Sequence, residues 1–271
     1  MEQAENETDP ILRKSLLRFI MVGGGFAGVE TAGEINDFVT DISKYYPNIQ
    51  TDDIKITLVE ATSEILTGFP RKLANFAKTK LMERGVEVLL NFGVRSFDGK
   101  QVFLENLEKS NDKQDKTILA SSLVWTAGVT PIDLIKDSLF KTEKGRIIVD
   151  EFLQVSGFPG VFAIGDCCKI NPELNKKRFP PTAQIAEAQA KTAAKNLRCL
   201  LSNTNMEEFD YEWRGQSAII GRMTGVASFF GMNISCFWAF VAWRNLYLSK
   251  MRSWEKRLRV WIDWNLSLIH I

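Results

Sequence analysis

The stretch Arg18-Phe19-Ile20-Met21-Val22-Gly23-Gly24-Gly25-Phe26-Ala27-Gly28 decides the fold. Its first part is a short apolar run, which predicts a buried strand. The glycines that follow have the spacing G-x-G-x-x-G, and a helix is expected from about Phe26. Gly23 allows a tight turn, Gly25 leaves room for a pyrophosphate, and Gly28 lets the helix pack close to the sheet. The stretch therefore predicts a strand–loop–helix unit that binds a dinucleotide.

The strand expected at 54–60 ends in a carboxylate, Glu60. A carboxylate at this point accepts both hydroxyls of an adenosine ribose and repels a 2′-phosphate, which predicts NAD rather than NADP. Gly28 and Glu60 are further apart than the usual spacing of about 20 residues. A long helix-to-strand loop at 45–53 accounts for the difference. The alternative is a glycine turn in an α/β protein that binds no ligand.

Strands and helices alternate around this motif. Asp9-Pro10 predicts the start of a short helix that ends near Leu17. The next expected elements are a helix at 26–43, a helix at 71–84 closed by Gly85, and a strand at 86–90. Short β-rich pieces follow at 101–104 and 117–121 around a polar turn at 109–116, and Trp125 ends a strand before a glycine turn at Gly128. This order predicts an α/β fold in which a Rossmann-like parallel sheet carries a β-meander.

The composition excludes several classes of function. The 271 residues are 45% apolar and 25% charged, as in ordinary globular proteins, and the net charge of +1 gives no overall attraction for nucleic acid. The four cysteines form no Cys-x-x-Cys, which favours reduced intracellular thiols. The single histidine, His270, disfavours a histidine base and a multi-histidine metal site, so we expect no metal. The polar, acidic start is not a signal peptide.

The C-terminal segment combines tryptophans with basic side chains. Residues 237–264 hold five of the seven tryptophans, and residues 244–259 hold six basic residues against one acid. On a helix, one face would carry Trp254, Leu258, Trp261, Ile262 and Leu268, roughly opposite Lys256, Arg259 and Asp263. This pattern predicts amphipathic helices at a membrane surface, with a core-packing helix as the alternative. Met223–Trp243 is uncharged and long enough to span a bilayer, but its polar residues favour strand and turn.

A second glycine motif lies at Gly160–Asp166, where an expected strand ends in Gly165-Asp166. An aspartate in this position can reach a cofactor hydroxyl, although a plain turn has the same pattern. Prolines in Phe179–Gln189 then open a helix, expected at 181–201, whose first turn carries Thr182 and Gln184. The amides and the positive dipole of that turn would face an electron-rich ring edge. A strand at 146–149 and a β-rich segment at 209–234 complete the expected elements.

Four motifs in this order resemble the type II NADH dehydrogenases: G-x-G-x-x-G-x-E, Thr-Ala-Gly, Val-Phe-Ala-x-Gly-Asp and Pro-Pro-Thr-Ala-Gln. These are single-subunit, non-pumping flavoproteins with two dinucleotide-binding domains. The resemblance covers essentially the whole chain. It implies FAD and NADH as cofactors, with hydride passing from NADH to FAD and electrons passing on to a membrane quinone. It also implies a peripheral membrane location, on the cytoplasmic face in a bacterium, and leaves a homodimer open.

The resemblance assigns roles to residues of this chain. It implies that Asp166 contacts the ribitol and pyrophosphate region of FAD, and that Ala183 and Gln184 lie beside the flavin ring and the quinone. Glu30, two residues past the third glycine, is implied at the nicotinamide–flavin junction, which makes Glu30 and Gln184 the catalytic candidates. The cofactor-binding candidates are Gly23, Gly25, Gly28, Glu60, Gly128, Gly165, Asp166, Thr182, Ala183 and Gln184.

The resemblance also predicts the domain organisation. Family members begin with their own G-x-G-x-x-G unit for the ADP part of FAD, which does not precede the glycine loop here, so the chain resembles their C-terminal part. We expect an NAD(H)-binding domain at 1–129, a partial FAD-binding domain at 130–234 and amphipathic membrane-surface helices at 235–271. The alternatives are a truncated, non-catalytic module that binds NADH and membrane, or another flavin-dependent pyridine-nucleotide reductase.

Overall fold

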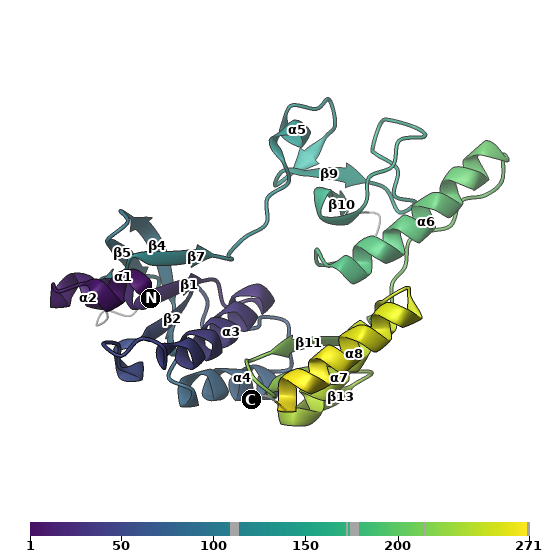
Figure 1. The fold of residues 1–271 in the computed structure, drawn as a ribbon. Helices are drawn as coiled ribbons and strands as arrows, with labels where there is room; N and C mark the ends of the chain where they lie inside the picture. The colour runs from purple at the N-terminus through teal and green to yellow at the C-terminus, as the bar shows by residue number, and fades with distance from the viewer. Residues whose placement is uncertain (109–113, 172, 174–178, 214, 270–271) are drawn as a thin grey trace. The chain divides into compact units, whose positions relative to one another are not determined.

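A parallel sheet forms around the strand that precedes the glycine loop, as the computed structural model shows (Figure 1). The structure describes residues 1–108, 114–171, 173, 179–213 and 215–269, the last three by their backbone. The sheet consists of β1 (Arg18–Val22), β2 (Lys55–Glu60), β3 (Glu87–Leu90) and β7 (Ser122–Trp125). Its order is β3-β2-β1-β7, and neighbouring strands are parallel. The predicted α/β fold with a Rossmann-like sheet is confirmed.

Both faces of this sheet are buried, because successive side chains of a strand point to opposite sides. Met21 and Leu58 pack against helices α3 (Phe26–Ser43) and α4 (Arg71–Glu83) on one side. Ile20 and Val59 pack on the other side against the meander of β4 (Phe92–Phe97), β5 (Gln101–Asn106) and β6 (Lys116–Leu119). The predicted β-meander is therefore present, and part of the polar turn expected at 109–116 lies outside the described residues.

The N-terminal helices are α1 (Glu2–Asn6) and α2 (Pro10–Leu16), and the 3₁₀ helix η1 (Thr51–Asp53) precedes β2. The Asp9 carboxylate accepts the N–H of Ile11 at 2.8 Å, so the predicted cap and proline start of α2 are confirmed. Ala4, Leu17 and Ile49 form a small buried cluster under these segments. Its position fixes the loop at 45–53 that separates the glycine motif from Glu60.

Residues Gly128–Trp213 form a second compact unit. Its elements are α5 (Asp133–Lys136), β8 (Thr142–Glu143), β9 (Arg146–Val149), the 3₁₀ helix η2 (Gly165–Cys167), β10 (Cys168–Ile170) and α6 (Ala183–Leu201). The strand predicted at 160–164 is wrong, because these residues have an isolated bridge from Phe162 to Gln154 instead of a ladder. The strand expected at 146–149 and the helix expected at 181–201 are present.

The C-terminal elements belong to the first unit, which comprises Met1–Ala127 and Arg214–Ile271. They are β11 (Gly215–Ile219), β12 (Gly225–Phe229), β13 (Met232–Ser235), α7 (Cys236–Lys250) and α8 (Trp254–Ile269). We expected residues 214–234 in the second domain. They group with the first unit because Ala218, Ile220 and Val226 join the core cluster of α3 and α4. The expected boundary near residue 129 lies close to the observed one at 127.

The uncharged run Met223–Trp243 is divided among a turn, β12, β13 and the start of α7. This confirms the expectation of strand and turn for that run. Among the helices of the described residues, none has the length and apolar character needed to cross a membrane. The side chain of Leu268 and the whole of His270 lie outside the described residues.

Candidate functional site

In the glycine loop between β1 and α3, the backbone conformation and the space for a Cβ atom differ from one glycine to the next. Gly23 has a φ of +106°, a left-handed conformation that favours glycine, and its N–H donates to the Val59 carbonyl at 2.8 Å. A Cβ at Gly28 would lie 1.7 Å from the Gly23 carbonyl oxygen, so only glycine lets α3 approach this turn. A Cβ at Gly25 would meet nothing within 4 Å. The loop is therefore closed on the protein side and open at Gly25.

The start of α3 is suited to an anion. Gly25 is the N-cap residue and offers no side chain to the first amides of the helix. These amides and the positive end of the helix dipole attract negative charge, and a phosphate is the usual ligand in such a place. The open space at Gly25 lies at this helix start, so the loop has both the room and the polarity for a pyrophosphate.

Glu60 lies against the glycine loop, as expected for the acid at the end of the second strand. One oxygen of its carboxylate, Oε2, accepts the N–H of Gly24. The other oxygen, Oε1, accepts both the N–H and the hydroxyl of Thr62 at 2.8 Å each. The carboxylate is partly buried and held in one orientation beside the loop, where it could accept the hydroxyls of a ribose.

Glu30 lies on α3 and contacts a strand from the far end of the sequence. Its Oε1 accepts the N–H of Ile219, the last residue of β11, at 3.0 Å. Burial raises the pKa of Glu30, the neighbouring Glu34 raises it further, and the Ile219 hydrogen bond lowers it. A carboxyl with a raised pKa near a cofactor loop is a common feature of functional sites. The contact with β11 had no signal in the local sequence.

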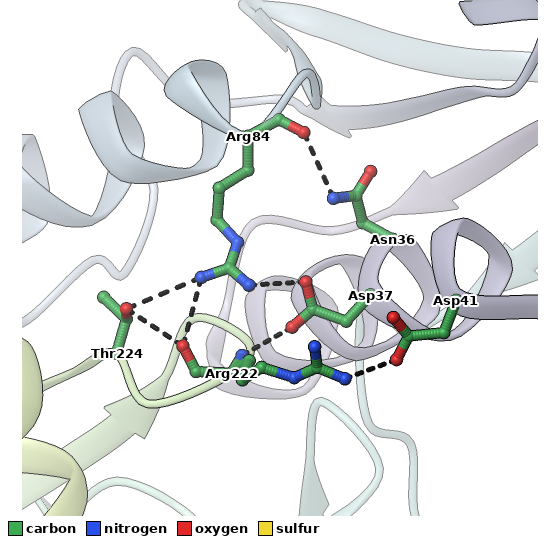
Figure 2. A network of polar contacts seen from close by, with 6 residues as sticks. All are labelled: Asn36, Asp37, Asp41, Arg84, Arg222 and Thr224. Atoms are coloured by element: carbon green, nitrogen blue, oxygen red, sulfur yellow. Dashed lines mark hydrogen bonds and ion pairs between the residues drawn. The ribbon is translucent and has the colours of Figure 1, made fainter. Parts of the chain in front are cut away.

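A polar network holds the rest of α3 against the turn between β11 and β12, as Figure 2 shows. Asp37 accepts the guanidinium of Arg84 with one oxygen and the backbone N–H of Arg222 with the other. The guanidinium of Arg222 pairs with Asp41. Arg84 also donates to the Arg222 carbonyl at 3.2 Å and to Thr224 Oγ1 at 3.5 Å. We call these five residues the α3 clamp.

The α3 clamp was not predicted, because its partners lie far apart along the chain. Asp37 and Asp41 resemble ordinary surface acids on a helix. The one local signal is Gly221, whose φ of +96° marks a tight turn, and where a Cβ would lie 2.5 Å from Asp37 Oδ2. The clamp connects the helix that begins at the glycine loop with the sheet that supports α7.

The second unit has a cavity of about 610 Å³ at the N-terminus of α6. Its lining includes Gly165 and Thr182 together with the basic residues Arg146 and Lys169. Thr182 is the N-cap of α6, and its hydroxyl accepts the N–H of Ile185 at 3.4 Å. Gly165 and Thr182, which the sequence places in two motifs, are thus brought to one cavity.

Two glutamines of α6 have defined partners within the second unit. The buried Gln189 accepts the N–H of Gly165 at 2.7 Å and so fixes the Gly-Asp turn. Gln184 accepts the hydroxyl of Tyr211 at 2.8 Å. Asp166 is exposed in η2, and Ala183 is the first residue of α6. The candidate residues are therefore divided: Gly23, Gly25, Gly28, Glu30 and Glu60 in the first unit, and Gly128, Gly165, Asp166, Thr182, Ala183 and Gln184 in the second.

The adjacent cysteines differ in their surroundings. Cys168 is buried in the cavity wall, and burial raises the pKa of its thiol to about 12. A thiol in this state is a poor nucleophile, because the thiolate is the reactive form. Cys167 and Cys168 are both free. The arrangement does not favour thiol–disulfide chemistry at this cavity.

Helices α7 and α8 expose large aromatic side chains. Trp254 and Trp261 on α8 are 71% and 52% exposed, and Trp238 on α7 is 70% exposed. Trp243 stacks on Trp264 with ring centroids 6.1 Å apart, and the Arg244 guanidinium lies 4.8 Å from the Trp264 ring. One set of aromatics thus joins the two helices while another faces outward. On the apolar face predicted for α8, the side chains that the structure describes, Trp254, Leu258, Trp261 and Ile262, are all exposed, which disfavours the alternative of a core-packing helix.

The fold and the glycine loop define an α/β protein of the nucleotide-binding type. Residues 2–190 match the family described as pyridine nucleotide-disulphide oxidoreductase, and the chain belongs to this family. It is 33% identical over 261 residues to a probable NADH dehydrogenase of Dictyostelium discoideum, covering 95% of this chain and 55% of that protein. It is 34% identical over 217 residues to a type II NADH:quinone oxidoreductase of Staphylococcus aureus, covering 80% and 52%. These relatives confirm the resemblance to type II NADH dehydrogenases.

The solved structures agree on the fold. NDH2 from Plasmodium falciparum, in a structure described as a complex with NADH, superposes with a TM-score of 0.86 at 22% identity. The match covers 97% of this chain and 68% of that one. The chain spans about half the length of the curated relatives it matches.

Proposed function

We propose that the first unit binds NADH and is the NADH-binding part of an NADH:quinone oxidoreductase. The observation that carries the proposal is the open, uncapped start of α3 at Gly25, with the Glu60 carboxylate fixed beside it. The pyrophosphate would lie over the amides of Gly25 and Phe26, and the adenosine ribose would donate to Glu60. The similarity to enzymes named for NADH oxidation supports the same substrate.

The second unit would contribute part of an FAD site. Its cavity would suit part of such a cofactor, because the amides at the start of α6 and the side chain of Arg146 supply hydrogen-bond donors and positive charge, while Lys169 is paired with Glu143 in the same wall. A bound flavin supplies the two-electron redox chemistry that links a nicotinamide to a quinone. Gln189 keeps the Gly165 turn in place, and Tyr211 orients the Gln184 amide.

Glu30 would hold a proton on its carboxyl group in the first unit. The Ile219 N–H occupies Oε1, so a proton on this carboxyl would sit on Oε2. The raised pKa brings its protonation closer to neutral pH than for an exposed glutamate. No nucleophile is needed for hydride transfer, since positioning and the cofactors carry the chemistry.

The C-terminal helices would hold the protein on a membrane surface, where a quinone is found. The exposed tryptophans of α7 and α8 suit the boundary between headgroups and acyl chains. Arg252, Lys256 and Arg259 line a shallow pocket of about 330 Å³, which fits an anionic headgroup.

The first test is a binding titration. The full chain should bind NADH, and Gly25→Val should abolish binding without loss of the fold, since the added atoms fill the space for the pyrophosphate. Absorbance at about 450 nm after FAD is added reports whether flavin is held. NADH-dependent reduction of a water-soluble quinone by the FAD-loaded chain would complete the case. Equal NADH affinity in parent and variant would contradict the NADH site.

A second candidate function is a module that binds NADH and membrane without flavin chemistry. It is supported by the segment 160–164, which has an isolated bridge where a sheet strand was expected. In that case the chain would bind NADH and vesicles, stay colourless after FAD is added and reduce no quinone. The spectrum therefore separates the two functions.

The membrane contact is tested by sedimentation with vesicles that contain anionic lipid. The double variant Trp254→Ala, Trp261→Ala should pellet less than the parent, and binding should weaken with salt because charges are screened beyond about 8 Å. Trp213→Ala, an exposed tryptophan of the second unit, is the matched control. These point variants are preferable to deleting 235–271, because α7 contributes the buried Ala239. Equal pelleting of all three proteins would refute a tail-based contact.

A further inference from the structure

The loop that follows Glu60 is attached to the glycine loop at several points. The N–H of Leu66 donates to the Gly24 carbonyl at 2.7 Å, while the N–H of Gly24 donates to Glu60. Ile65 is buried, and a Cβ on Gly24 would lie 2.9 Å from its Cγ2 atom. Both polar atoms of the Gly24 backbone are thus bound by residues at or just after the end of β2.

Thr62 lies in this loop and contacts the carboxylate of Glu60 twice. Its N–H and its Oγ1 both lie 2.8 Å from Glu60 Oε1. Its own carbonyl accepts the N–H of Asn91 at 3.1 Å, which fixes the backbone of Thr62 from the side of β3. The threonine is therefore placed by the fold, and its side chain acts on the orientation of the carboxylate.

The Thr62 hydroxyl has two acceptors and one proton. Oγ1 lies 2.8 Å from Glu60 Oε1 and also 2.8 Å from the Glu64 carbonyl oxygen. The hydroxyl can donate to one of them at a time. When it donates to Oε1, that oxygen has two donors from Thr62, while Oε2 accepts the Gly24 N–H and has a second lone pair for a further donor.

We propose that Thr62 is a positioning residue that acts through Glu60 and sets the preference for NADH over NADPH. The inference rests on the NADH site proposed above. A ribose hydroxyl can donate to the second lone pair of Oε2, while Thr62 keeps both of its contacts with Oε1 and holds the carboxylate in place. The fixed carboxylate also opposes a 2′-phosphate, because it cannot swing away from the second negative charge.

The test measures the dissociation constants of NADH and NADPH for the full chain at one ionic strength. Thr62→Val keeps the shape and removes the hydroxyl, so NADH should bind about threefold to tenfold more weakly. NADPH should bind equally well or better. The dissociation constant of NADPH divided by that of NADH should therefore fall. Thr62→Ser keeps the hydroxyl and should keep the ratio. Thr67→Ala, an exposed threonine of the same loop, is the matched control.

The ratio distinguishes positioning from general loss of structure, which would weaken both ligands alike. Thr62→Ala provides a second variant with a smaller side chain, and its ratio should fall as in Thr62→Val. An unchanged ratio in both variants, with NADH still bound by the parent, overturns the role of Thr62 alone. A parent that binds neither dinucleotide overturns the proposed NADH site, and the inference falls with it.

Discussion

The two glycine turns of this chain, Gly23–Gly28 and Gly160–Asp166, look alike in sequence and differ in structure. Both patterns predict an apolar strand that ends in a glycine turn. In the first unit, β1 pairs with β2 along its whole length and with β7 from Phe19 to Val22. In the second unit, residues 160–164 have an isolated bridge. The backbone of residues 160–164 is bound to that of residues 153–155 at this bridge alone, and an apolar run forms a strand only where such pairing continues over several residues.

The two turns are also held by different kinds of contact. Backbone and neighbouring loops fix the first turn, since Gly23 donates to Val59 and Gly24 is bound by Glu60 and Leu66. The second turn is bound largely by side chains: the buried Gln189 accepts the N–H of Gly165, Gln154 accepts the N–H of Gly160, and the Cys168 thiol donates to the Gly165 carbonyl. We therefore expect loss of Gln189 to loosen the Gly165 end of the second turn, whereas the first turn keeps its backbone contacts with Val59 and Leu66 when a side chain is changed.

The largest effect is expected at the first turn, from Gly28→Ala. The added Cβ would lie 1.7 Å from the Gly23 carbonyl oxygen, so α3 or the turn must move. We expect a loss of about 3 kcal/mol or more in the free energy of unfolding, measured with urea. Gly25→Ala is the control, because its Cβ meets nothing within 4 Å. It should cost less than about 1 kcal/mol. Similar losses in both variants would contradict the steric difference.

The next largest loss of stability is expected from Arg84→Ala, which tests whether the α3 clamp supports the helix that follows the first turn. Arg84→Ala removes the partner of Asp37 and two further hydrogen bonds, and both side chains of the pair are mostly buried. We expect a loss of about 2 kcal/mol in the free energy of unfolding. Lys80→Ala removes a more exposed ion pair on α4, the helix that Arg84 follows, and should cost less than about 1 kcal/mol. If the two variants unfold alike, the clamp adds no stability.

A smaller effect is expected at the second turn, from Gln189→Leu. The Gly165 N–H would lose its acceptor, which should cost about 1–2 kcal/mol. Amide hydrogen exchange should speed up at Gly165 and its neighbours, while exchange in β1 stays as in the parent. Glu187→Gln, which changes an exposed ion pair of the same helix, is the control. Unchanged exchange at Gly165 would show that the turn has another support.

Sequence reasoning found the elements whose causes are local. The cap of α2 at Asp9, the turn at Gly23 and the end of α4 at Gly85 each depend on residues a few positions apart. The family resemblance added Glu30 and Gln184 as candidates. Their partners Ile219 and Tyr211 could not be predicted, because tertiary contacts between distant segments leave no periodic pattern. The same reason hid the α3 clamp. The prediction at 160–164 failed because these residues pair with residues 153–155 at a single bridge and the pairing does not continue into a ladder.

The smallest effect concerns Glu30, on the helix that follows the first turn. Burial and the repulsion of Glu34 raise its pKa, so the folded chain binds this proton more tightly than the unfolded chain. The contribution to stability is therefore fully present below the unfolded pKa of 4.5 and lost as pH rises through the folded pKa. Glu30→Gln keeps an oxygen that can accept the Ile219 N–H and removes the buried charge.

The melting temperature of Glu30→Gln should exceed that of the parent by about 1–3 °C at neutral pH. The difference should shrink as pH falls and disappear well below 4.5, because Glu30 is then protonated in the folded and unfolded chains alike. Glu105→Gln, at an exposed position of β5, should melt like the parent at each pH. A constant difference between about pH 4 and pH 8 would contradict the raised pKa as its cause. Hydride transfer should be measured in the same variant. A variant that melts higher and transfers hydride more slowly would identify Glu30 as a functional residue, since functional residues commonly cost stability.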